Sequence, residues 1–133
     1  MLDTNTVSHI VRGRSLLARA RFEAMSTPYR PCISAITEGE IRYGLAKNPA
    51  ANAFRLLMEE FLAKLQTLPW GTAEAATYSA LRAEMRAAGK ALENLDMLIA
   101  AHAVATGTTL VTSDKAFLQV RGLRGIEDWA TDL

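Results

Sequence analysis

The chain has 133 residues, a formal net charge of +1, and a composition that is 50% apolar and 22% charged. This balance is typical of a globular domain and excludes a disordered tail, while the near-neutral charge excludes nucleic-acid binding through overall charge alone. We expect one domain over residues 1–133, since single domains commonly have this length. No apolar run approaches the ~20 residues of a membrane span, and Asp3 interrupts any signal peptide, so we expect no membrane contact and a cytoplasmic location. The single cysteine, Cys32, is expected to be buried and reduced.

Apolar spacing and the positions of Gly and Pro predict strands that alternate with helices. We expect a short strand ending near Asp3, then helices over 4–12 and 15–25, a strand over 30–35, helices over 36–46 and 50–65, an extended segment over 66–69, helices over 72–88 and 95–105, a strand over 109–112, a short helix over 114–120, and a last strand around Ile126. Gly89 and Gly107 are placed to end two of the helices. This alternation predicts an α/β fold with a parallel sheet covered on both faces.

Four acidic residues occupy comparable positions in this pattern: Asp3, Glu40, Asp96 and Asp114. Three of them lie where a predicted strand turns into a helix, and open parallel sheets bind ligands beyond the carboxyl ends of their strands. Asp96 begins the most apolar helix, where a buried carboxylate is costly without a cationic partner. Carboxylates without His or Cys suit Mg²⁺ or Mn²⁺, and one such ion, or two about 4 Å apart, can activate water against a phosphodiester.

Each acid also has a simpler structural explanation. Thr37 and Glu40 fit the S/T-x-x-E capping box at a helix start. Asp3 and Asp114 could each cap a helix, and Asp96 could be favoured in a first turn by the helix dipole. The sequence pattern by itself leaves capping and metal binding open.

Four stretches in order resemble the PIN-domain ribonucleases and, within them, the VapC toxins of type II toxin–antitoxin modules: MLDTNTVSHI, ISAITEGEIRYGL, LDMLIAAHAVATGTTLVTSDKAF and GLRGIEDW. The resemblance implies a PIN-like three-layer α/β/α domain with a central, mainly parallel sheet. It implies Mg²⁺- or Mn²⁺-dependent endonucleolytic cleavage of RNA, with transfer RNA the family-level expectation. It further implies a cognate VapB-type antitoxin that plugs the active site, and a homodimer.

The resemblance also assigns roles by position. Asp3 and Asp96 match the principal metal ligands, and Glu40 completes the acidic pocket, partly through waters. Asp114 matches a fourth acid, at a position where many VapC proteins have Asn. Supporting roles fall to two polar residues, Thr112 and Asn5, of which Thr112 steadies the site and Asn5 is expected to orient Asp3.

Glu38 competes with Glu40 for the same role, but two residues of helix turn it about 200° away. His9 and His102 each lie six residues after an acid, about 240° round a helix, so we expect both to be packing or surface residues. Because the net charge is small, RNA contact is expected to depend on local arginines, and we nominate Arg12 and Arg14.

Three other functions remain open at this stage. The segment from Asp3 to Val7 echoes the D-x-D-x-T/V motif of haloacid-dehalogenase-type phosphatases, although Asn5 replaces the second acid. A phospho-receiver module is a weaker alternative, because its paired acids and late lysine are missing. A domain that only binds RNA or a protein partner is the non-enzymatic alternative.

Overall fold

The computed structural model describes residues 1–25 and 27–131. Its elements in chain order are α1 (Thr4–Val11), α2 (Leu16–Glu23), β1 (Cys32–Ser34), α3 (Ala35–Ala46), α4 (Asn52–Leu62), β2 (Gln66–Leu68), α5 (Thr72–Ala87), α6 (Asn94–Thr106), β3 (Leu110–Val111), the 3-10 helix η1 (Lys115–Gln119) and β4 (Ile126–Glu127). This is the predicted order of helices and strands, with most elements shorter than expected. Within the described residues, no helix is long and apolar enough to cross a membrane.

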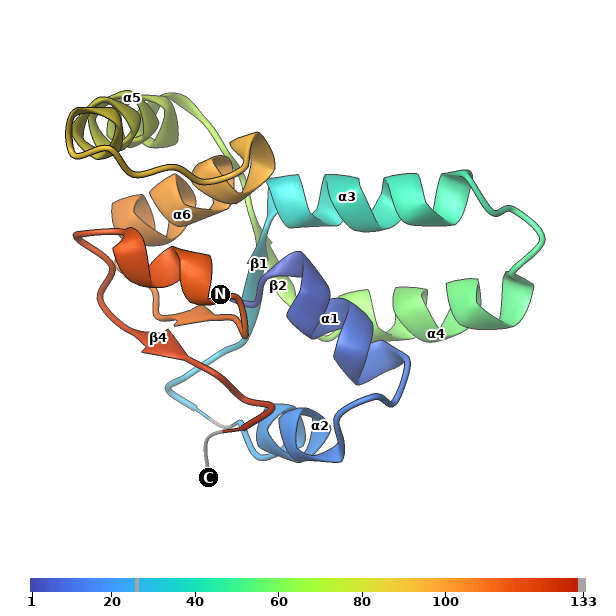
Figure 1. The fold of residues 1–133 in the computed structure, drawn as a ribbon. Coiled ribbons are helices and arrows are strands. Elements are labelled where there is room, and N and C mark those ends of the chain that lie inside the picture. The colour runs from blue at the N-terminus through green and yellow to red at the C-terminus, as the bar shows by residue number, and fades with distance from the viewer. Residues whose placement is uncertain (26, 132–133) are drawn as a thin grey trace.

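The first three residues join two pairs of parallel strands into one sheet. Strand β1 pairs with β2, and β3 pairs with β4. Between them, the Leu2 amide donates to the Cys32 carbonyl at 2.8 Å, and the Val111 amide donates to the Met1 carbonyl at 2.8 Å. The spatial order is therefore β2, β1, residues 1–3, β3, β4, with the N-terminal segment in the centre (Figure 1).

The direction of chain growth reverses at this central segment. The chain first adds β1 and β2 on one side of residues 1–3, and then crosses to add β3 and β4 on the other side. In open parallel sheets, the ligand crevice forms beyond the carboxyl ends of the two strands that flank such a reversal. Here those ends lead into Asp3 and Thr112.

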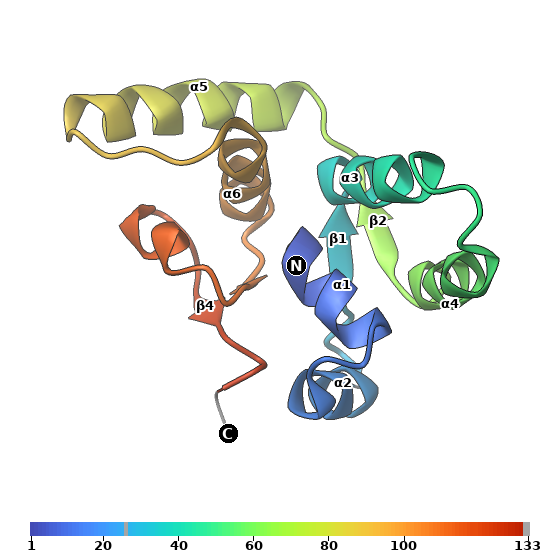
Figure 2. The same cartoon turned by 45° about the vertical axis from the view of Figure 1, so that its right-hand side comes forward.

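Alternate strand residues face two separate helical layers, as the period of two in a strand requires. Toward α1–α4 point Leu2, Ile33 and Val111. Toward α5, α6 and η1 point Met1, Cys32 and Leu110. The two layers, visible on opposite sides of the strands in Figure 2, confirm the predicted α/β/α architecture and the burial of Cys32.

The capping box predicted at Thr37 and Glu40 is wrong. Helix α3 begins before Thr37, because the Ser34 hydroxyl at the end of β1 caps it by accepting a hydrogen bond from the Ile36 amide at 3.0 Å. Thr37 is consequently inside the helix and fully buried, and its hydroxyl has no partner among the described residues. Glu40 is left free for another role.

Two other expectations also differ in detail. The short helix expected over 114–120 is a 3-10 helix of five residues, Lys115–Gln119. The strand predicted over 30–35 shortens to Cys32–Ser34 because the cap at Ser34 starts α3 at once. The predicted helix ends at Gly89 and Gly107 are confirmed, since Gly107 caps α6 with a positive φ of 64° and Gly89, just after α5, has a φ of 72°.

Candidate active site

Asp3 is fixed at the carboxyl end of the central segment. Its Oδ1 accepts a hydrogen bond from the Thr6 amide at 2.8 Å, which caps α1, and its Oδ2 accepts one from the Thr112 hydroxyl at 2.5 Å. The residue is only 5% exposed. The predicted capping role of Asp3 is therefore confirmed, and the Thr112 contact joins the carboxylate to the end of β3.

Asp114 approaches from the same end of β3. Its backbone amide donates to the Thr112 hydroxyl at 3.0 Å, and its Oδ1 accepts from the Ala116 amide at 2.9 Å as the cap of η1. Thr112 thus contacts both segments that carry an acid. The Asp114 residue is exposed, at the rim of this edge of the sheet.

Glu40 faces the start of α1, whereas Glu38 does not. The Glu40 carboxylate accepts a hydrogen bond from the hydroxyl of Thr4, the residue that follows Asp3. Glu38 instead pairs with Arg42 on its own helix at 3.4 Å. The expected rotation of the two acids away from each other is confirmed, and Glu40 is the one brought toward Asp3.

Asp96 lies in the first turn of α6, and its side chain has no hydrogen bond or ion pair with the described residues. Burial, and after it the negative charges of neighbouring carboxylates, raise the pKa of Asp96 from its ordinary value of 3.8 to about 6. The carboxylates that contribute are Asp114, Glu93, Glu40 and Asp3, and no cationic side chain contributes to the shift. The other three predicted acids, Asp3, Glu40 and Asp114, therefore all act electrostatically on Asp96 at this edge of the sheet.

Two residues differ from what the sequence suggested. Glu93, exposed at the N-cap of α6, is a fifth carboxylate near Asp96 that the sequence interpretation did not nominate. Its spacing of three from Asp96 at a helix start was the available signal. Asn5 is exposed and has no hydrogen bond to Asp3 within the described part of the chain, so Thr6 and Thr112 orient that carboxylate instead.

The donor set fits a hard divalent cation, although its side chains are not gathered around one point. Among residues 1–25 and 27–131, no three Asp, Glu, His or Cys side chains lie close enough together to hold a metal ion. Asp3, Glu40 and Asp114 are turned toward hydroxyl or amide donors. A cluster of oxygen ligands that repel one another without a compensating cation suits Mg²⁺ or Mn²⁺, which retain waters between themselves and some ligands. Asp3 and Asp96 could hold such an ion directly, with Glu40 and Asp114 reached through waters.

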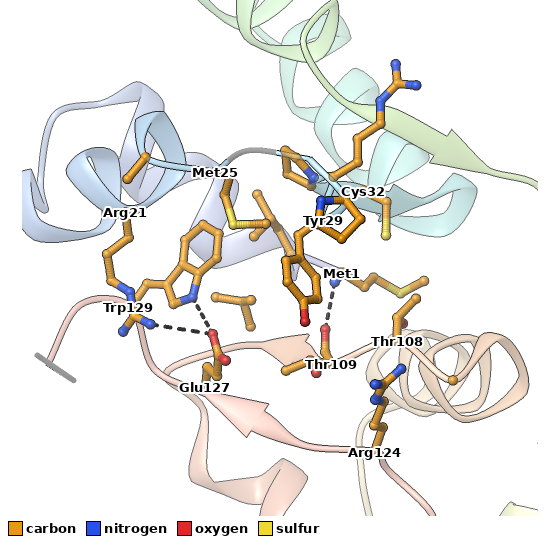
Figure 3. A pocket seen from close by; sticks show the side chains of 17 residues that line it. Met1, Arg21, Met25, Tyr29, Cys32, Thr108, Thr109, Arg124, Glu127 and Trp129 are labelled. Carbon is orange, nitrogen blue, oxygen red and sulfur yellow. Dashed lines mark hydrogen bonds and ion pairs between the residues drawn. The ribbon is translucent and has the colours of Figure 1, made fainter.

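A separate cavity lies away from these acids. It has a volume of about 690 Å³ and is lined near the amino ends of the strands by Met1, Cys32 and Thr109, and on its other sides by residues that include Met25 and Trp129 (Figure 3). None of the four predicted acids lines it. The acidic edge, rather than this cavity, carries the chemistry that the sequence predicts.

The nominated arginines lie at the far end of α1 from Asp3, about 12 Å along an eight-residue helix. The Arg12 guanidinium lies over the Phe54 ring at 4.2 Å from its centroid, and its Nε donates to Ser8 at 3.2 Å. Arg14 is exposed. Of this pair, Arg14 is the freer to reach a ligand.

Comparisons with known proteins identify the family. The PIN domain profile matches residues 1–123. The chain is 35% identical over 130 residues to the tRNA(fMet)-specific endonuclease VapC of Salmonella typhimurium, covering 97% of this chain and 96% of that protein. It is 34% identical, with the same coverage, to Ribonuclease VapC2 of Haemophilus influenzae.

Solved structures agree with the sequence matches. The structure of VapBC2 from Rickettsia felis bound to a promoter DNA fragment has a TM-score of 0.88 at 27% identity, covering 96% of this chain and 98% of that one. DNA-bound VapBC from Salmonella typhimurium also has a TM-score of 0.88, at 35% identity, covering 97% of this chain and 96% of that one. These matches leave the phosphatase and phospho-receiver alternatives without support. The chain belongs to the PIN-domain family and, within it, to the VapC group.

Proposed function

We propose that the chain is the toxin of a type II toxin–antitoxin module and cleaves RNA as an endoribonuclease that depends on Mg²⁺ or Mn²⁺. The observation that carries the proposal is the gathering of Asp3, Glu40 and Asp114 around Asp96 at one edge of the sheet. Their charges, with burial, raise the pKa of Asp96, and no cationic side chain opposes this rise. The relatives named as VapC ribonucleases support the reaction class, and one named for tRNA(fMet) supports initiator transfer RNA as the substrate.

The raised pKa of Asp96 favours metal binding over simple capping. A first-turn acid stabilised only by the helix dipole would have a lowered pKa, because the dipole favours the charged form. The pKa of Asp96 is raised instead, so burial and repulsion outweigh the dipole. A divalent cation is the partner that would relieve this repulsion, since hard cations prefer carboxylate oxygens.

In this proposal, the role of each acid depends on the hydrogen bonds that hold its carboxylate. Asp3 and Asp96 bind the metal, and a bound divalent cation would supply charge that activates water and stabilises the phosphodiester during its cleavage. Thr6 and Thr112 fix the Asp3 carboxylate, so little reorganisation accompanies substrate binding. Thr4 holds Glu40, and Asp114 lies at the rim, where each can orient a water.

The acidic edge also suits an inhibitory partner. A guanidinium pairs bidentately with carboxylates, so an arginine from an antitoxin would compete for the same acids. Exposed apolar side chains on α2 and α4, namely Leu16, Leu56 and Leu57, provide surface that a second chain can cover. The solved structures named VapBC support a VapB-type antitoxin as that partner. The family resemblance also implies that the chain forms a homodimer, and light scattering would measure its mass in solution.

Replacing Asp96 with Asn should stabilise the metal-free protein in a pH-dependent way. The raised pKa means that the native state holds a proton between about pH 4 and pH 6 that the unfolded chain releases, so Asp96 lowers stability as pH rises through this window. At pH 7.5, with a chelator, Asp96→Asn should gain about 1 kcal/mol after allowance for solvent screening, and nothing at pH 4. Urea unfolding measures both values, with exposed Glu60→Gln as the control expected to change neither. A destabilised Asp96→Asn protein at pH 7.5 would indicate a cap.

Glu40 and Glu38 form a matched pair for the cleavage reaction. Glu40→Gln should lower Mn²⁺-dependent RNA cleavage by roughly 10–100-fold, because Glu40 acts on the metal through water. Glu38→Gln should keep the parental rate, since Glu38 pairs with Arg42 on the same helix. Single-turnover cleavage of a transfer RNA by purified variants measures the difference. Equal rates for the two variants would refute the assignment of Glu40.

RNA contact through Arg12 and Arg14 is tested by the salt dependence of binding. Replacing both with Ala should weaken RNA affinity and reduce the slope of log affinity against log salt by about 0.7 for each phosphate that the protein no longer neutralises. The control replaces Arg82 and Arg86, two exposed arginines of α5, with Ala. An effect confined to the control would place the RNA on α5 instead.

The partner is tested in cells. Expression of the chain alone should arrest growth, and co-expression of the protein encoded beside it should restore growth. Replacing an arginine in that protein's C-terminal tail should restore toxicity even where the two proteins still co-purify, because the acids lose their guanidinium partner. Full protection by an arginine-free tail would contradict this mechanism of inhibition.

A further inference from the structure

His102 is a buried polar residue for which the proposed reaction has no use. It is fully buried in the middle of α6, and its Nδ1 lies 2.7 Å from the Ser34 hydroxyl, which is also fully buried. The expectation that His102 is a packing residue is confirmed. Packing alone does not explain a polar pair here, because burying polar groups costs free energy that an apolar pair would avoid.

The hydrogen-bond partners indicate which atom carries each proton. The Ser34 hydroxyl oxygen already accepts from the Ile36 amide, so its own proton is available to donate to Nδ1. The ring proton then lies on Nε2, which faces Glu74 Oε1 at 3.9 Å. Burial lowers the pKa of His102, against the opposing effects of Glu74 and the Pro69 carbonyl, so the ring is neutral at pH 7.

Ser34 and His102 join the two helices that carry Glu40 and Asp96. Ser34 caps α3 six residues before Glu40, and His102 lies on α6 six residues after Asp96. Helices α3 and α6 contact each other beside the end of β1 (Figure 2). Each acid is therefore about 9 Å along its own helix from this hydrogen bond, with rigid helix between them.

We propose that Ser34 and His102 are a positioning pair, whose hydrogen bond sets α3 against α6 and thereby fixes where Glu40 stands relative to Asp96. The inference rests on the proposed function, since it concerns the metal site of that function. Carboxylates that repel one another favour separation of the helices that carry them, and a directional bond opposes this where apolar contacts would allow sliding. On the other side of the ring, Glu74 of α5, which accepts from the Gly71 amide at 2.9 Å, lies 3.9 Å from Nε2, beyond hydrogen-bonding distance.

A catalytic role for this group is excluded by access. Serine, histidine and a carboxylate in this order resemble a hydrolase nucleophile with its base. Ser34 is fully buried, however, and its oxygen is occupied by the Ile36 amide, so no substrate can reach it. The pair acts through Glu40 and Asp96 rather than on RNA.

The test uses His102→Leu, which removes the acceptor but leaves Ser34 to cap α3. Mn²⁺ affinity, measured by calorimetry without RNA, should fall about tenfold, as it does when groups that orient metal ligands are removed. His102→Asn should restore most of the affinity, because its Oδ1 occupies the position of Nδ1 and can accept from Ser34. Ile99→Val on the same helix is the matched control, expected to lower stability but to keep parental Mn²⁺ affinity.

The outcomes separate the inference from the function. Parental affinity in His102→Leu, or an equal reduction in Ile99→Val, would overturn the positioning role while leaving the metal site intact. Absence of Mn²⁺ binding in the parental protein would overturn the proposed function and the inference together. If His102→Leu fails to fold, the Mn²⁺ affinities of His102→Asn and His102→Gln are compared instead, since only Asn presents its amide oxygen at the Nδ1 position. Equal Mn²⁺ affinities for these two variants would then overturn the pair.

Discussion

The pairing of residues 1–3 between β1 and β3 is the constraint on which the acidic edge depends. The Asp3 amide donates to the Val111 carbonyl at 3.0 Å, so the register of this central segment determines where its side chain emerges. A slip of one residue would turn Leu2 toward the opposite helical layer and move Asp3 away from the edge, because successive side chains face opposite sides of a sheet. The same pairing brings Thr112 within hydrogen-bonding distance of Asp3. Sheet stability and site geometry therefore share the same backbone contacts.

Helices that start directly after strands bring Glu40 and Asp114 to that edge, whereas Asp96 reaches it at the start of α6, which follows α5. Because strands are parallel and lead directly into helices, the residues just after each strand gather at one end of the sheet. Asp3 and Asp114 use one oxygen each to cap a helix, and the cap fixes the carboxylate whether or not it binds anything else. The choice between cap and ligand is thus a false one at these positions. Asp96 differs, because no hydrogen-bond donor among the described residues contacts its carboxylate. Its pKa is set by burial and by the other negative charges.

Sequence periodicity predicted the order of the elements and a sheet covered on both faces, because apolar spacing directly reflects burial. It failed where two polar residues competed for one local role. Thr37 matched a capping pattern, but Ser34, the last residue of β1, lies three residues earlier and is the residue that caps α3. Asn5 adjoined Asp3 in sequence, yet the hydroxyl that orients Asp3 comes from Thr112, 109 residues away. Contacts of this kind depend on tertiary packing, which local patterns do not record.

The two residues that were missed differ in the signal available. Glu93 acts on Asp96 three residues along the same helix, a spacing that the sequence shows, whereas His102 contacts Ser34 on another element and stands in no local motif that reveals it. The helical spacing of six residues correctly placed His102 on a different face of α6 from Asp96. It gave no information on what His102 contacts on that face. In a three-layer domain the opposite face of α6 packs on the sheet, where Ser34 emerges beside it. A residue turned away from the acids can therefore still govern them, because both faces of one rigid helix move together.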